Sequence, residues 1–138
     1  MWVFTKEGVF SAVWDKYCRG DEVMIRAHCK DDLCRLAKRI IGYCDDGLIF
    51  EAEDADYRYR IKIPKTVWSE YLADCALQID YPSVKKNIIP DNDPLRKDAY
   101  YQVWETLFRW RSKKEQQGRA GDDSPKESRM SMPIRWQR

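Results

Sequence analysis

The sequence lacks the long apolar runs and the glycine- and serine-centred motifs that would point directly to a function. No run of about 18 apolar residues is present, so we expect no membrane-spanning helix. The first residues do not place an apolar stretch after a basic one, so we expect no signal peptide. Phosphate-binding glycine loops, nucleophile elbows and dinucleotide fingerprints are absent as well. These absences favour a cytoplasmic protein without membrane contact, and they argue against an enzyme.

The chain also has little histidine and only a small net charge. His28 is the only histidine, and the formal net charge of the 138 residues is +2. A nearly neutral chain argues against a strong electrostatic footprint for nucleic acid. The five cysteines are an odd number, and cytosolic thiols are kept reduced, so we expect free thiols rather than a disulfide framework.

The few residues that could support catalysis or metal binding are poorly spaced for either role. His28 and Cys29 are neighbours on a predicted strand, so their side chains should point to opposite faces and cannot form a nucleophilic pair. Cys34 and Cys44 complete a set of four potential zinc ligands, but the two closely spaced pairs of a zinc site are missing. An acidic cluster without a calcium-loop pattern comprises Glu51, Glu53, Asp54 and Asp56. We therefore expect no catalytic residue, no metal and no cofactor.

The stretch 57–79 predicts how the core is built. Aromatic and aliphatic residues alternate with basic ones, which is typical of a strand with one buried face and one wet face. The expected inward set is Tyr57, Tyr59, Ile61 and Ile63, and the outward set is Arg58, Arg60 and Lys62. Pro64 cannot donate to a strand ladder and should end the strand. A helix should follow with Thr66 as its N-cap, and its apolar stripe is Trp68, Leu72, Cys75 and Ile79.

Similar patterns predict four more strands and two more helices. The strands are expected at 2–6, 8–15, 22–29 and 48–53, with hairpins joining the first two strands and joining 48–53 to the strand at 57–63. One helix should begin at an Asp31 cap and the other at Pro94 after an Asp93 cap, ending near Lys114. Hairpins followed by helices predict an α+β fold. The expected architecture is a single domain with a mostly antiparallel sheet of about five strands and three helices packed on it.

Two segments are predicted after position 93. The helix that begins at Pro94 has the apolar stripe Tyr100, Val103, Trp104, Leu107 and Phe108, whereas Trp110 lies off the stripe and should be exposed. Residues 115–138 should form a flexible basic tail beyond the globular domain 1–114, because glycine, serine and charged residues cannot repay the entropy of ordering.

The end of the tail predicts a contact with another protein. Apolar residues return there after the polar stretch, and Trp and Arg are frequent hot-spot residues of protein interfaces. The candidate partner-binding residues are Trp110, Met132, Ile134, Arg135 and Trp136.

The alternative is a nucleic-acid-binding module that uses a basic strand face and the tail. Its candidate residues are Arg58, Arg60, Lys62, Lys85 and Lys86. Nucleic-acid surfaces combine such charges with aromatic rings on which bases stack. Because the tyrosines of the predicted strand should point away from the arginines, the pattern favours a solvated face over this alternative.

Four stretches resemble a family of small uncharacterised bacterial and phage-encoded proteins. They are Met1-Trp2-Val3-Phe4-Thr5-Lys6 with Gly8 and Ser11-Ala12-Val13, Ala55-Asp56-Tyr57-Arg58-Tyr59-Arg60, Ile79-Asp80-Tyr81 with Lys85, and Asp98-Ala99-Tyr100 with Val103-Trp104. The family tends to read Asp-Tyr-x-Asn-Phe-Lys where this chain has Asp80-Tyr81-Pro82-Ser83-Val84-Lys85. The resemblance implies a bacterial, phage or mobile-element setting and no activity. We therefore expect a non-enzymatic protein that binds another protein, such as a host or defence factor.

Overall fold

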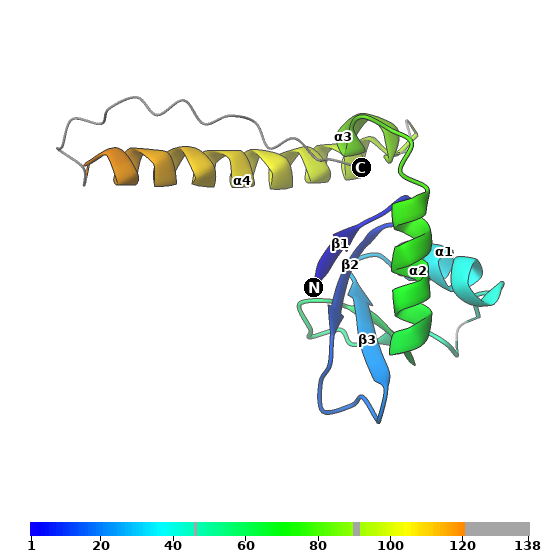
Figure 1. The fold of residues 1–138 in the computed structure, drawn as a ribbon. Helices are drawn as coiled ribbons and strands as arrows, with labels where there is room; N and C mark the ends of the chain where they lie inside the picture. Colours follow the sequence, from blue (N-terminus) through cyan, green and yellow to red (C-terminus); the bar gives the residue numbers. More distant parts are fainter. Residues whose placement is uncertain (46, 90–91, 121–138) are drawn as a thin grey trace, which may run out of the picture. The chain divides into compact units, whose positions relative to one another are not determined.

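A computed structural model describes residues 1–45, 47–89 and 92–120 (Figure 1). The chain forms two compact units, Met1–Asp91 and Asn92–Arg138, which are considered separately below. The first unit contains a sheet of five antiparallel strands and the second contains a long helix. The predicted α+β class with a five-stranded antiparallel sheet is therefore confirmed.

The strands follow the predicted hairpins but are shorter than expected. They are β1 (Trp2–Phe4), β2 (Val9–Val13), β3 (Glu22–Ala27), β4 (Phe50–Glu51) and β5 (Tyr59–Pro64). Their order in the sheet is β1-β2-β3-β5-β4, and each pair of neighbours is antiparallel. The predicted hairpins β1–β2 and β4–β5 are present, and β5 also pairs with β3 along its whole length.

Three helices belong to the first unit: α1 (Lys30–Ile41), α2 (Lys65–Leu77) and the short α3 (Val84–Asn87). The N-caps of α1 and α2 are Cys29 and Pro64, and neither makes a side-chain capping bond. The predicted caps Asp31 and Thr66 are therefore wrong, because each helix begins before its proposed cap. Asp31 instead lies in the first turn of α1, where a carboxylate suits the helix dipole.

The hydrophobic core lies between one face of the sheet and the helices α1 and α2. Figure 1 shows both helices on the same side of the strands. The sheet contributes Phe10, Ala12, Val23, Ile25, Ala27, Ile61 and Ile63, and the helices contribute Leu33, Leu36, Ala37, Trp68 and Tyr71. The inward direction predicted for Tyr59, Ile61 and Ile63 is confirmed. The opposite face of the sheet carries the alternate residues of each strand.

The turn between β1 and β2 is fastened to α1 by a buried carboxylate. Asp32 Oδ2 accepts a hydrogen bond from the Val9 amide at 3.2 Å, and Arg35 donates to Asp32 Oδ1 at 2.5 Å. Gly8 passes so close that an added Cβ would lie 2.4 Å from the Asp32 side chain. Only glycine fits at this position, so the turn and the first turn of α1 pack as one piece.

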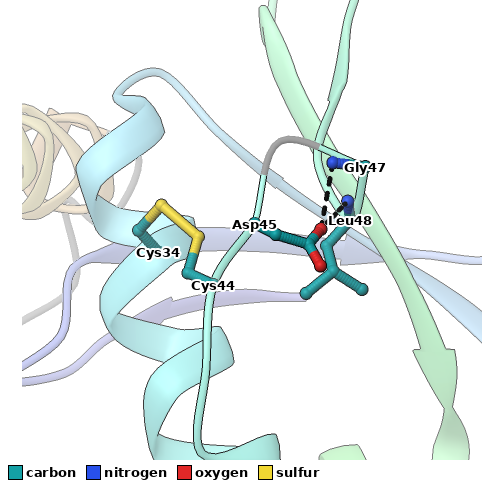
Figure 2. Close-up of a disulfide and its surroundings, with 5 residues drawn as sticks. All are labelled: Cys34, Cys44, Asp45, Gly47 and Leu48. Atoms are coloured by element: carbon teal, nitrogen blue, oxygen red, sulfur yellow. Dashed lines mark hydrogen bonds between the residues drawn. A yellow bond between two sulfur atoms is a disulfide. The ribbon is translucent and has the colours of Figure 1, made fainter.

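A disulfide joins Cys34 in α1 to Cys44 after the helix (Figure 2). Gly42 ends α1 with a φ of +84°, a left-handed conformation that glycine adopts readily. The chain then turns back along the helix, which brings the Cα atoms of the two cysteines to 5.3 Å. The prediction of free thiols is wrong for this pair, because the pairing depends on the turn at Gly42.

The segment that follows the disulfide is held by a local carboxylate. Figure 2 shows Asp45 accepting hydrogen bonds from the amides of Gly47 and Leu48, at 3.0 and 3.1 Å. Leu48 packs against the core, and Ile49 is buried in it. The disulfide and this turn together lead the chain from α1 into β4.

The second unit contains α4 (Pro94–Ala120), and its start is as predicted. The Asp93 carboxylate accepts a hydrogen bond from the Arg96 amide at 3.0 Å, so Asp93 caps the helix. The helix continues past its predicted end near Lys114, because Glu115 pairs with Arg111 at 3.4 Å and Gln116 and Gln117 favour helix. The predicted tail beyond Ala120 lies outside the described residues.

Candidate functional site

The largest group of exposed apolar side chains among the described residues lies on α4. We define the aromatic face of α4 as Tyr101, Val103, Trp104, Leu107, Phe108 and Trp110. Leu107 is 59% exposed and Phe108 is 45% exposed, so the stripe predicted for the core of this helix is largely accessible apart from Tyr100, which is buried. The exposure predicted for Trp110 is confirmed. Exposed apolar surface of this extent is typical of a docking site.

The rings of the aromatic face are ordered along the helix. Trp104 stacks on Phe108 with 5.4 Å between centroids, and the Arg111 guanidinium lies 5.0 Å from the Phe108 centroid. The Lys114 ammonium lies 5.4 Å from the centroid of Trp110. These i, i+3 and i, i+4 contacts hold the rings in place, so the face is preorganised for binding.

Basic residues follow the aromatic face toward the end of α4. Five basic residues and one acidic residue lie between 109 and 120, namely Arg109, Arg111, Lys113, Lys114, Arg119 and Glu115. The polar side of the helix pairs its charges locally, as in the 2.7 Å contact between Arg109 and Glu105. The C-terminal half of the helix therefore carries an excess of positive charge. The other predicted partner-binding residues, Met132, Ile134, Arg135 and Trp136, lie outside the described part of the chain.

A second surface lies on the sheet face opposite α1 and α2. The register places five directly opposed residues in one row across all five strands: Trp2, Ser11, Arg26, Arg60 and Phe50. Lys62 lies in the next row, opposite Met24. We call Trp2, Arg26, His28, Phe50, Tyr57, Arg60 and Lys62 the basic face. Directly opposed residues share a face of an antiparallel sheet, so cations from β3 and β5 meet there.

Tyr57 belongs to the basic face, although the sequence pattern predicted an inward direction. It precedes β5 in a bend, so strand alternation does not apply to it. Its ring stacks on His28 with 4.4 Å between centroids, and the Arg26 guanidinium lies 4.6 Å from the ring centroid. The Tyr57 carbonyl accepts a hydrogen bond from Arg60 Nε at 3.2 Å. An aromatic ring therefore does lie among the cations.

Arg58 is engaged elsewhere and does not join this cluster. Its guanidinium lies 2.5 Å from Glu51 Oε1 and 3.8 Å from Glu53 Oε1. The hydrogen bond with Glu51 raises the pKa of Arg58 above its ordinary value. Arg58 is thus paired with two acids, whereas Arg60 lies opposite Phe50 instead of an acid.

The other lysines of the predicted nucleic-acid set lie on a different element. Lys85 and Lys86 are in α3, outside the sheet. Of the five candidates, the structure brings only Arg60 and Lys62 together on one face. Sequence reasoning missed Arg26, His28, Phe50 and Tyr57. The signal that could have found Arg26 and His28 is the alternation of β3, in which both are out of phase with the buried Ile25 and Ala27.

A small pocket lies between β1 and α2 and has a volume of about 210 Å³. Its wall is mostly apolar and includes Val3, Leu72 and Ile79, with Glu7 and Arg39 as charged members. Burial raises the pKa of the Cys75 thiol that also lines it, so this sulfur stays protonated at neutral pH. The pocket can hold a small apolar group, and its thiol is a poor nucleophile.

Beside this pocket a buried polar cluster joins β1 to α2. The Tyr71 hydroxyl lies 2.7 Å from both Thr5 Oγ1 and Glu7 Oε2, and burial raises the pKa of Tyr71. Arg39 pairs with Asp74 and lies 3.7 Å from Glu7 Oε1. Each of these groups has a partner within the fold, so the cluster is structural.

The remaining candidates show no catalytic or metal-binding arrangement in residues 1–45, 47–89 and 92–120. His28 stacks on Tyr57, and Cys34 and Cys44 are joined to each other. No group of His, Cys, Asp and Glu among these residues could hold a metal ion. No helix in the same residues is long and apolar enough to cross a membrane.

Comparisons with protein-family models, curated proteins and solved structures give no match for this chain.

Proposed function

We propose that this is a small non-enzymatic binding protein that docks on another protein through the aromatic face of α4. The observation that supports the proposal best is the accessible row of Trp104, Leu107 and Phe108 on one side of a regular helix. Tryptophan and arginine dominate the energetics of protein interfaces, and an amphipathic helix commonly inserts its apolar side into a groove. The buried Tyr71 and the protonated Cys75 offer no activated group for catalysis.

The proposed partner carries a hydrophobic groove with an acidic rim. The groove would accept the aromatic face, and the rim would complement the basic end of α4 beginning at Arg109. A second copy of this chain fits less well, since parallel pairing would bring two basic ends together. Met132, Ile134, Arg135 and Trp136 would provide a second anchor for the same partner. Following the resemblance in sequence, we propose a host or defence factor as the partner in a phage or mobile-element setting.

The test compares two variants of the full chain in capture experiments from bacterial lysate. Leu107→Ser changes the aromatic face, and Gln102→Ser is a matched change on the polar side of α4, where Gln102 donates a hydrogen bond to Asp98. We expect Leu107→Ser to lose a captured protein that the wild type and Gln102→Ser retain, and we expect raised salt to weaken the capture. Equal capture by both variants, or self-association as the only interaction, would contradict the proposal.

The cytoplasmic location expected from the sequence also stays a proposal. Cytosolic thiols are kept reduced, so Cys34 and Cys44 should then react with a maleimide added to intact cells. A pair that is protected from the maleimide by its disulfide would place the protein in an oxidising compartment.

A further inference from the structure

The basic face of the sheet, separate from the proposed docking helix, combines cations with aromatic rings on one surface. Arg26 and Arg60 lie in the same cross-strand row, and Lys62 lies 3.9 Å from Glu22, the acidic residue beside it. Three basic residues therefore face one acidic residue on this side of the sheet. The row from Trp2 to Phe50 crosses five strands at spacings of about 4.8 Å, which gives a strip about 19 Å long.

Aromatic rings lie at both ends and in the middle of this strip. Trp2 is 73% exposed and Phe50 is 53% exposed, and the Lys62 ammonium lies 5.8 Å from the Phe50 centroid. Near the centre, Tyr57 is stacked against His28 and lies under the Arg26 guanidinium. Trp2 and Phe50 therefore offer exposed ring surfaces, with Lys62 close to Phe50, whereas the Tyr57 ring is held between His28 and Arg26.

Arg26 shows that the hydrogen bonding of this face is incomplete. One of its terminal nitrogens donates to Ser11 Oγ at 2.8 Å, but its Nε is buried and has no hydrogen-bond partner. A buried donor without an acceptor is costly, so an anionic ligand that displaces the Arg26 side chain and supplies an acceptor would be favoured. Phosphate oxygens are strong acceptors for arginine.

We propose that the basic face binds single-stranded nucleic acid, with bases stacked on Phe50 and Trp2 and phosphates held by Arg26, Arg60 and Lys62. Single strands are the form whose bases are exposed for stacking, and sheet surfaces with aromatic rings and flanking cations bind them in this way. A duplex hides its bases, so it would meet only the charges. RNA and DNA share this chemistry, and the 2′-hydroxyl is the group that would distinguish them.

The test measures binding of the full chain to labelled oligouridylate and oligothymidylate of about 12 nucleotides by fluorescence anisotropy. We expect affinity to fall steeply between about 50 and 200 mM salt, and Arg60→Gln to reduce the slope of log K against log salt by about one. Arg58→Gln is the matched control, since it removes the same charge from a neighbouring position that is paired with Glu51. Phe50→Ala should weaken binding about tenfold, because it removes a stacking ring that lies outside the core.

Several results would overturn the proposal. They are the absence of binding at the lowest salt, equal weakening by Arg58→Gln and Arg60→Gln, and equal competition by a duplex or by polyglutamate. Trp110→Ala should leave oligonucleotide binding unchanged, so failure of this proposal can be distinguished from failure of the docking proposed for α4. A preference between the uridylate and a deoxyuridylate strand of the same length would support the proposal and identify the sugar that the face accepts.

Discussion

At the scale of single residues, the buried hydroxyl of Tyr71 makes the stability of the fold depend on pH. Tyr71 is fully packed in α2, yet its hydroxyl reaches Thr5 and Glu7 at the end of β1. Burial raises its pKa above the ordinary value of a tyrosine. The hydroxyl therefore stays neutral in the folded protein at a pH where an unfolded chain would ionise it.

This shift predicts a loss of stability in alkaline solution. A raised pKa in the folded state means that stability is complete below about pH 10 and falls as the pH rises further, by at most about 1.4 kcal/mol per unit. Tyr71→Phe should lower the free energy of unfolding at pH 7 by about 1–3 kcal/mol and should flatten its decline above pH 10. Urea unfolding at several pH values would measure both effects. Tyr43→Phe, at an exposed position, is the control and should change neither.

Single residues also mark the limits of inference from the sequence. Period-2 alternation placed Tyr59, Ile61 and Ile63 correctly, because these residues belong to a regular strand. The same rule failed for Tyr57, since the chain bends before β5 begins and turns this ring to the basic face. Bends of this kind depend on contacts with distant residues such as Arg26, and no local pattern records them.

At the scale of elements, the disulfide fixes how α1 is followed by β4. It links the middle of α1 to the chain just beyond Gly42, so the turn after the helix is anchored before Leu48 and Ile49 enter the core. Asp45 adds two hydrogen bonds to backbone amides in the same turn. The short β4 depends on the anchored turn that precedes it, because β4 has only two residues to hold it in the sheet.

Reduction of this bond should destabilise the protein measurably. A closed loop of this length predicts a cost of about 2–3 kcal/mol in the free energy of unfolding. The double variant Cys34→Ser with Cys44→Ser should show the same loss in chemical denaturation, whereas Cys29→Ser should not. An unchanged free energy of unfolding after reduction would show that the bond does not constrain the fold.

Element types were easier to predict than their packing. The hairpins, the order of strands and helices, and the Asp93 cap followed from turn residues and periodicity. The apolar stripe of α4 was expected to be buried, yet Leu107 and Phe108 are exposed. Periodicity shows that a helix has an apolar side, but it cannot distinguish a side for the core from a side for a partner.

At the scale of the whole molecule, the two units expose surfaces of different chemistry. The first unit buries its apolar residues between the sheet and two helices, and it leaves cations on the other sheet face. The second unit carries a long helix whose apolar side is accessible. Two surfaces of different chemistry are therefore available for binding, one aromatic with a basic end and one flat and cationic.

The most direct test of the proposed function places a photoreactive amino acid on α4 in living cells. At Leu107, on the aromatic face, irradiation should produce a covalent adduct of the full chain with one other protein. At Gln102, on the polar side of the same helix, it should produce none or far less. Adducts in equal amount from both positions, or adducts with a second copy of this chain alone, would contradict docking of the aromatic face on a partner protein.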